Sequence, residues 1–195
     1  MKVFHGSNII GLDILKPHLA DHDRPYIYLS TIEVVAGFYM VNAVEKPYYW
    51  FPYGFDHGTP VYFELYPNAL KEVSEGKEGC IYEVTANEKD VLPFKNIPCA
   101  RLGTVPMEVV NCTKILDAYD WFMQEKLESK LKVVRYGTMN EKQMNNWYRM
   151  IFDYIKGKNM IETPECSYAK FVQCKFPHVW EQYEKGNNKY INILI

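Results

Sequence analysis

The sequence lacks most of the short patterns that identify a protein class directly. It has no Cys-x-x-Cys pair, no Gly-x-Gly-x-x-Gly run and no P-loop, so it indicates neither a zinc site nor a Rossmann or Walker-type phosphate site. Ser7 has no Gly-x-Ser-x-Gly context, which leaves a hydrolase nucleophile elbow unsupported. No apolar run approaches the roughly 20 residues that a membrane-spanning helix needs.

An excess of charge of either sign is also missing. The chain carries 22 Lys and Arg against 24 Asp and Glu, a formal net charge of −2, whereas a dedicated nucleic-acid binder is usually strongly basic. Its 5 cysteines are an odd number without a disulfide pattern, which indicates a reducing compartment. The first seven residues turn polar too early for a secretory signal. We therefore expect a soluble cytoplasmic protein that does not bind a membrane or nucleic acid.

Aromatic and aliphatic residues are plentiful. Hydrophobic residues make up 48% of the 195 residues, and 16 Tyr stand beside 10 Phe and 4 Trp. That content is enough for a core in one domain, or in one domain with an appendage. The tyrosine excess is unusual, because a buried phenol needs a hydrogen-bond partner that phenylalanine does not need.

The pattern of predicted elements changes near residue 115. Alternating apolar residues predict short strands ending at His5-Gly6-Ser7 and covering 26–29, 61–66, 80–85 and 107–110. Ser30-Thr31-Ile32-Glu33 matches a capping box and predicts a helix that ends before Pro47. Helical spacing follows at 116–127 and, most strongly, at 141–156, with a short helix expected within 165–185. These patterns predict an α+β core over residues 1–115 and a helical C-terminal region over 116–195, packed on that core.

Three separated segments carry the candidate chemistry. His5-Gly6-Ser7 ends a strand, Tyr26 to Thr31 runs from a strand into a helix, and Glu108 lies on a late strand. Together they resemble the motifs of the ADP-ribosyltransferase-like superfamily in its histidine, tyrosine, glutamate form. The resemblance covers roughly residues 1–112, and the small bacterial rifampin-modifying transferases look closest.

The resemblance implies a split antiparallel β core that binds NAD in a cleft. NAD would be a substrate, cleaved between nicotinamide and ribose, with a protein, a small molecule or water as the unknown acceptor. His5 would bond the adenosine ribose, and the Gly6 backbone would approach the nicotinamide amide. Tyr28 or Tyr39 would stack on the nicotinamide ring. The implied binding set is His5, Gly6, Ser7, Tyr28, Ser30 and Tyr39.

Glu108 would hold the nicotinamide ribose and stabilise positive charge as the glycosidic bond breaks, so His5, Tyr28 and Glu108 form the implied catalytic set. One nicotinamide riboside can be held by all three only if they lie within about 10 Å of one another. Glu64 and Glu83 lie on other predicted strands and are alternatives to Glu108. Arginine-directed protein modification is disfavoured, because Pro106 stands where such relatives carry Glu or Gln.

Two further segments and two further functions stay open. Residues 18–23 contain two His and two Asp, but their spacing matches no known metal site, so a solvated loop without metal is expected. Residues 47–55 are rich in aromatics and would form a wall over the cleft, a satellite core or a partner surface. The chain could therefore be a nucleotide-binding module for NAD or ADP-ribose without turnover. It could also be an interaction protein that uses the aromatic loop.

Overall fold

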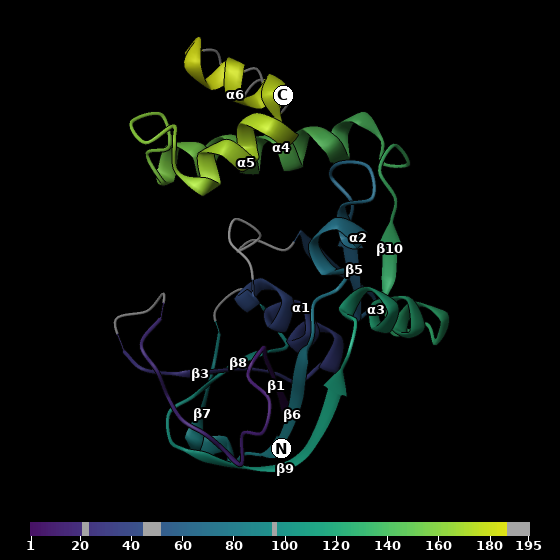
Figure 1. The fold of residues 1–195 in the computed structure, drawn as a ribbon, viewed down its shortest axis with the longest axis vertical. Helices are drawn as coiled ribbons and strands as arrows, with labels where there is room; N and C mark the ends of the chain where they lie inside the picture. The colour runs from purple at the N-terminus through teal and green to yellow at the C-terminus, as the bar shows by residue number, and fades with distance from the viewer. Residues whose placement is uncertain (21–23, 45–51, 95–96, 187–195) are drawn as a thin grey trace.

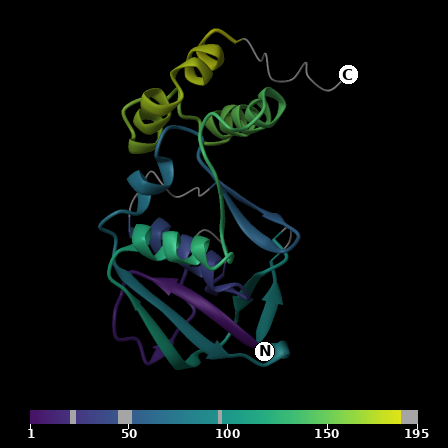
Figure 2. The same ribbon diagram turned by 90° about the vertical axis from the view of Figure 1, so that its right-hand side faces the viewer.

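The computed structural model describes residues 1–20, 24–44, 52–94 and 97–186. It confirms an α+β architecture, with a large antiparallel sheet and six α-helices in the described part. Figures 1 and 2 show the large sheet at one end of the molecule, helices α4, α5 and α6 at the other, and α1, α2 and α3 between them. No described helix is both long and apolar enough to cross a membrane.

The large sheet has seven strands in the order β2-β9-β6-β1-β3-β8-β7, and each neighbouring pair is antiparallel. Their bounds are β1 Lys2–Ser7, β2 Ile14–Leu15, β3 Ile27–Ser30, β6 Gly79–Thr85, β7 Val91–Pro93, β8 Ala100–Gly103 and β9 Met107–Ile115. A 3₁₀ turn, Glu88–Asp90, precedes β7. The strands expected at 26–29, 80–85 and 107–110 are confirmed, and each observed end lies within five residues of the predicted one.

Side chains alternate between the two faces of this sheet and build two cores. One face carries Val3, Ile27, Leu29, Tyr82 and Val84, all buried in a core that has no helix in it. The opposite face lies against the helices, whose larger core extends from Val34 of α1 to Trp180 of α6. The C-terminal helices therefore share a core with the N-terminal half.

A smaller sheet joins the two halves of the chain. It has the order β10-β5-β4, with β4 at Tyr53–Asp56, β5 at Thr59–Phe63 and β10 at Lys132–Val134. Strand β10 pairs in parallel with β5, which is the strand expected at 61–66. The region after residue 115, which we expected to be helical, therefore also supplies a strand.

The helices begin and end close to the predicted positions, but their caps differ. The bounds are α1 Glu33–Val44, α2 Ala69–Ser74, α3 Ala118–Leu127, α4 Glu141–Gly157, α5 Ser167–Lys175 and α6 Pro177–Glu184. The expected capping box at Ser30 is wrong, because the Ser30 hydroxyl bonds the backbone of Ile32 in a tight turn before α1 begins. The 165–185 region forms two helices, since Phe176-Pro177 ends α5 and begins α6.

Strand β1 lies directly against the backbone of α1 at Gly6. A Cβ added at Gly6 would stand 1.8 Å from the Ala36 carbonyl oxygen and 2.8 Å from the Met40 amide nitrogen, closer than real Cβ atoms approach such groups. Only a residue without a side chain fits at this point. The close approach fixes the helix on the central strand of the sheet.

A buried ion pair links the end of β5 to the end of β10. The Glu64 carboxylate is only 2% exposed, and its Oε1 accepts a hydrogen bond of 2.8 Å from Nη1 of Arg135. The same oxygen accepts a longer bond from the Leu70 amide, while Nη2 of Arg135 contacts the Met123 sulfur. Arg135 keeps 38% of its side chain exposed, so the pair lies at the margin of the core.

The outer edge of β9 is largely open among the described residues. Strand β2 pairs only with Met107 and Glu108, and no other described strand pairs with β9 on that side. At Cys112 the backbone amide donates to the side-chain oxygen of Asn111 at 2.9 Å. A side chain thus satisfies a backbone group on a strand that has an open edge.

We predict that Gly6→Ala lowers the free energy of unfolding by about 3 kcal/mol or more, because the new methyl group overlaps backbone that cannot move aside alone. Urea unfolding followed by circular dichroism measures this loss. Gly157→Ala is the control, since a Cβ there meets nothing within 4 Å at the end of α4. Equal effects of the two substitutions would contradict the close contact between β1 and α1.

We also predict that Arg135→Met lowers the free energy of unfolding by about 2 kcal/mol, because it leaves the Glu64 carboxylate buried without its cation. Adding Glu64→Gln to Arg135→Met removes that charge and recovers most of the loss. Thermal and urea unfolding of the two single variants and the double variant measure the coupling. If the double variant lost as much stability as the sum of the losses in Arg135→Met and Glu64→Gln, the two residues would not be coupled.

Candidate functional site

The site begins where β1 and β3 separate. The two strands are paired at a single position, Phe4 opposite Ser30, and in a continuous antiparallel ladder Gly6 would then lie opposite Tyr28. Gly6 instead lies against α1 and pairs with Ile81 of β6. The sheet therefore opens into a split between β1 and β3 immediately after Phe4.

His5 spans this split. Its Nδ1 donates a hydrogen bond of 2.8 Å to the Tyr28 carbonyl oxygen. In a regular ladder, a backbone amide of β1 would donate to this oxygen instead. The sequence-predicted residues His5 and Tyr28 are thus in direct contact, through a side chain on one strand and the backbone of the next. The contact fixes the position of the imidazole within the split.

Burial favours the neutral form of His5, and the hydrogen bond to Tyr28 fixes its tautomer. Removal from water lowers its pKa, the bond to the Tyr28 backbone opposes that change, and the charge of His18 lowers the pKa further. The ring is therefore neutral at pH 7. Because a carbonyl can only accept, Nδ1 carries the proton and Nε2 holds a lone pair that can accept a hydrogen bond.

Tyr26, just before β3, and alternate residues of β3 use the same backbone edge toward the split. The Tyr26 backbone exchanges two hydrogen bonds with His18, at 3.2 and 3.0 Å. The Tyr28 carbonyl binds His5, and Ser30 is paired with Phe4. The His18 ring lies 6.1 Å from the Tyr28 ring, between centroids. His18, which we expected in a solvated loop, is therefore a neighbour of the candidate site.

A second polar group lies where β3 leads into α1. Ser30 is fully buried, and burial raises the pKa of the nearby Cys99 thiol, while a hydrogen bond with Ser30 opposes that rise. The hydroxyls of Tyr39 and Tyr53 lie 3.2 Å apart. Burial raises the pKa of both phenols, so both remain protonated at neutral pH.

The structure gives Gly6 and Ser7 local roles. Gly6 faces the α1 backbone, which explains the missing side chain without a ligand. The Ser7 hydroxyl accepts a hydrogen bond from the Ile9 amide at 3.1 Å and so shapes the turn after β1. Both residues lie beside His5 in the chain, but their observed contacts stabilise the fold.

Glu108 lies away from this group. Val3 pairs with Val84 of β6, and Val84 pairs with Val109 of β9, so Glu108 is level with the beginning of β1. At ~4.8 Å between strands and ~3.3 Å per residue, two strands and three residues place the Cα atoms of His5 and Glu108 about 14 Å apart.

The two side chains also leave opposite faces of the sheet. Met107 and Val109 belong to the helix-free core, so Glu108 between them points to the other face and is exposed. His5 shares its face with Val3, which belongs to that same core, whereas Tyr28 lies between Ile27 and Leu29 of that core, so its ring projects from the same face as Glu108. The separation exceeds the 10 Å expected for a shared ligand, and the structure does not bring Glu108 together with His5 and Tyr28.

Neither alternative carboxylate takes its place. Glu64 is held by Arg135 on the smaller sheet. Glu83 of β6 pairs with Lys2 at 2.7 Å, on the far side of β1 from β3. On the other side of β3, the neighbouring strand β8 carries no carboxylate.

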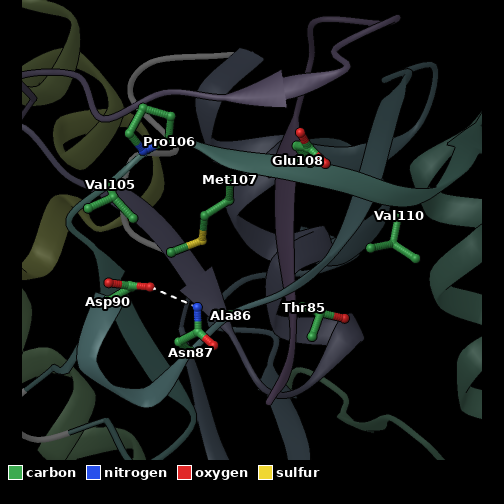
Figure 3. A pocket seen from close by; sticks show the side chains of 9 residues that line it. All are labelled: Thr85, Ala86, Asn87, Asp90, Val105, Pro106, Met107, Glu108 and Val110. Carbon is green, nitrogen blue, oxygen red and sulfur yellow. Dashed lines mark hydrogen bonds between the residues drawn. The ribbon is translucent and has the colours of Figure 1, made fainter.

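Glu108 instead borders a separate cavity of about 340 Å³ (Figure 3). There the Asn87 amide donates to the Asp90 carboxylate at 3.0 Å, and Met107 points into the middle of the cavity. Glu108 lies across the cavity from the Asn87–Asp90 pair. No cluster of three or more potential metal ligands occurs among the described residues.

Sequence reasoning gave no site role to two of the neighbours described above, namely His18 and Cys99. His18 stands in a polar loop, and Cys99 precedes β8 in an irregular stretch, so neither lies in a periodic pattern. Tyr53 was named within the aromatic segment 47–55, of which 47–51 lie outside the described residues.

Comparison of the chain with protein-family models, with curated proteins and with solved structures finds no match.

Proposed function

We propose that the chain binds NAD or a related nucleotide at the split between β1 and β3. The observation that carries the proposal is the buried imidazole of His5, whose Nδ1 donates to the backbone carbonyl of Tyr28 and whose Nε2 is left as an acceptor. A ribose hydroxyl is a donor that the Nε2 lone pair can accept, and a planar base can stack on an aromatic ring.

The fold supports the same proposal at a coarser level. The sheet is antiparallel and opens between its histidine-bearing and tyrosine-bearing strands, as an ADP-ribosyltransferase-like core would. The proposal therefore keeps the ADP-ribosyltransferase-like fold as the architecture. Tyr39 of α1 remains a second aromatic candidate for stacking. Its hydroxyl already has a partner in Tyr53, so stacking of a base would need only the face of its ring.

Binding is favoured over cleavage of the nicotinamide–ribose bond. Cleavage builds positive charge on the ribose and calls for a nearby carboxylate. Glu108 is about 14 Å from His5 by strand register and leaves the other face of the sheet. A nucleotide-binding module without turnover is the function that the arrangement of His5, Tyr28 and Glu108 supports best.

We predict that wild-type protein binds NAD, and that His5→Ala and Tyr28→Ala each weaken binding at least about tenfold, or ~1.4 kcal/mol. The first substitution removes the Nε2 acceptor and the second removes the aromatic ring. Isothermal titration calorimetry on variants with unchanged circular dichroism measures the effect.

Glu108→Gln is the matched control and should leave NAD affinity unchanged. Nicotinamide release from labelled NAD separates binding from turnover. Release by wild type that Glu108→Gln abolishes would overturn the binding-only proposal in favour of a transferase or glycohydrolase. Failure of wild type to bind NAD or ADP-ribose would reject the nucleotide site itself.

The pH dependence of NAD binding tests the role of the neutral imidazole. A charged His5 has no lone pair at Nε2, and its folded pKa lies below 6.5. We predict constant affinity from pH 8 to about 6.5, and a loss only as pH falls through the lowered pKa of His5. His5→Ala should flatten the acidic part of the profile. An affinity that rises on acidification would contradict acceptance by Nε2.

A further inference from the structure

Two of the free cysteines are neighbours on adjacent strands of the large sheet. Cys80 of β6 is opposite Lys114 of β9, and Tyr82 of β6 is opposite Cys112 of β9. Cys80 and Cys112 are therefore diagonal neighbours across one antiparallel strand pair. Opposed residues of such a pair project from the same face, so both thiols lie on the side of the helix-free core, together with the Tyr82 ring.

The two thiols differ in their access to solvent. Cys80 is completely buried in the helix-free core, whereas Cys112 is exposed near the end of β9. Partial removal from water, followed by hydrogen bonding with the Cys80 thiol, raises the pKa of Cys112 to about 11, while the Tyr82 hydroxyl opposes the rise. An oxidant in solution therefore reaches Cys112 first, and Cys80 is the thiol next to it.

No other cysteine competes for this position. All five cysteines lie in the described part of the chain. Cys99 is beside Ser30 at the beginning of α1, Cys166 caps the start of α5, and Cys174 lies near the end of that helix. The sheet therefore brings together one pair of thiols that are 32 positions apart in the sequence.

Strand β9 is free to make the small movement that a bond between the two sulfur atoms requires. Diagonal neighbours in a regular sheet have Cα atoms about 7–8 Å apart, whereas a disulfide spans at most about 6.8 Å, so β9 must approach β6 by about 1 Å. No described strand pairs with β9 on its outer side at Cys112. Its register with β6 also shifts between Glu83 and Val84.

We propose that Cys80 and Cys112 are an oxidation site that a hydroperoxide converts reversibly to a disulfide. The Cys112 thiolate attacks one oxygen of hydrogen peroxide, the O–O bond breaks, and a sulfenic acid forms while the other oxygen leaves as water with the proton of the Cys112 thiol. The Cys80 sulfur then attacks the Cys112 sulfur, the S–O bond breaks, and a second water leaves with the proton of Cys80. Two thiols lose two electrons, which reduce the peroxide.

The buried thiol gives this site its reversibility. An exposed sulfenic acid without a neighbouring thiol is oxidised further to a sulfinic acid, which ordinary thiol reductants do not reverse. Cys80 resolves the sulfenic acid at Cys112 before that step. The disulfide also ties β9, whose outer side is open at this point, to the interior strand β6. Neither thiol belongs to the proposed nucleotide site, so this proposal stands independently of NAD binding.

The test treats the reduced protein with hydrogen peroxide and follows free thiols in denaturant, intact mass and peptides mapped without reduction. We expect wild type to lose two of its five thiols and two hydrogens in mass, to give a cross-linked peptide that contains Cys80 and Cys112, and to recover with dithiothreitol. Cys112→Ser should give no such peptide. Cys174→Ser removes another exposed thiol, on α5, and is the matched control that should keep the cross-link.

Cys80→Ala separates the roles of the two thiols. Cys112 of this variant should gain two oxygens, and dithiothreitol should not remove them. The same oxygen adduct on wild-type Cys112, with Cys80 left as a thiol, would overturn the proposal. A disulfide from Cys112 to Cys174 or to a second copy of the chain would overturn it as well. A Cys112 that peroxide leaves unmodified in wild type would have the same consequence.

Discussion

The contact between Gly6 and the backbone of α1 is the constraint on which the described core depends. It holds the central strand of the large sheet against the helix that follows β3, with no side chain between them. Because Gly6 is held there, it cannot complete the ladder opposite Tyr28, and the His5 imidazole occupies that hydrogen bond instead. Helix contact, sheet opening and candidate site are consequences of one close approach.

Much of the fold could be predicted from local pattern, and much of the site could not. The long apolar periodicity at 141–156 corresponds to α4, and the branched and aromatic runs correspond to β3 and β6, because such patterns reflect which face is buried. Strand order is different, since it depends on contacts far apart in the chain. Chain order places Glu108 after Tyr28, but β9 lies beyond β6, and the neighbour of β3 is β8. The caps show a similar limit, because the pattern Thr138-x-x-Glu141 predicts a capping box at the start of α4, but the prediction is wrong and Asn140 forms the box with Gln143.

The tyrosine excess has a physical explanation in several of the described positions. The Tyr82 hydroxyl donates to the Ile9 carbonyl and accepts from the Leu12 amide, so it anchors the loop after β1 beneath the helix-free core. Tyr39 and Tyr53 pair with each other between α1 and β4. In each case the ring fills apolar space while the hydroxyl satisfies a group that phenylalanine could not reach. The chain uses tyrosine to join segments that no regular ladder connects.

The hydrogen bond from the Cys112 amide to Asn111 has a consequence for the molecule in solution. An open strand edge is a template on which a foreign strand can assemble, and each free amide is one of its attachment points. The Asn111 side chain already occupies one such amide, that of Cys112, and Lys114 adds an exposed charge two residues beyond Cys112 on the same strand. This short stretch of β9 therefore disfavours self-association by strand pairing. It lies at the one long sheet edge that is uncovered in the described part of the fold.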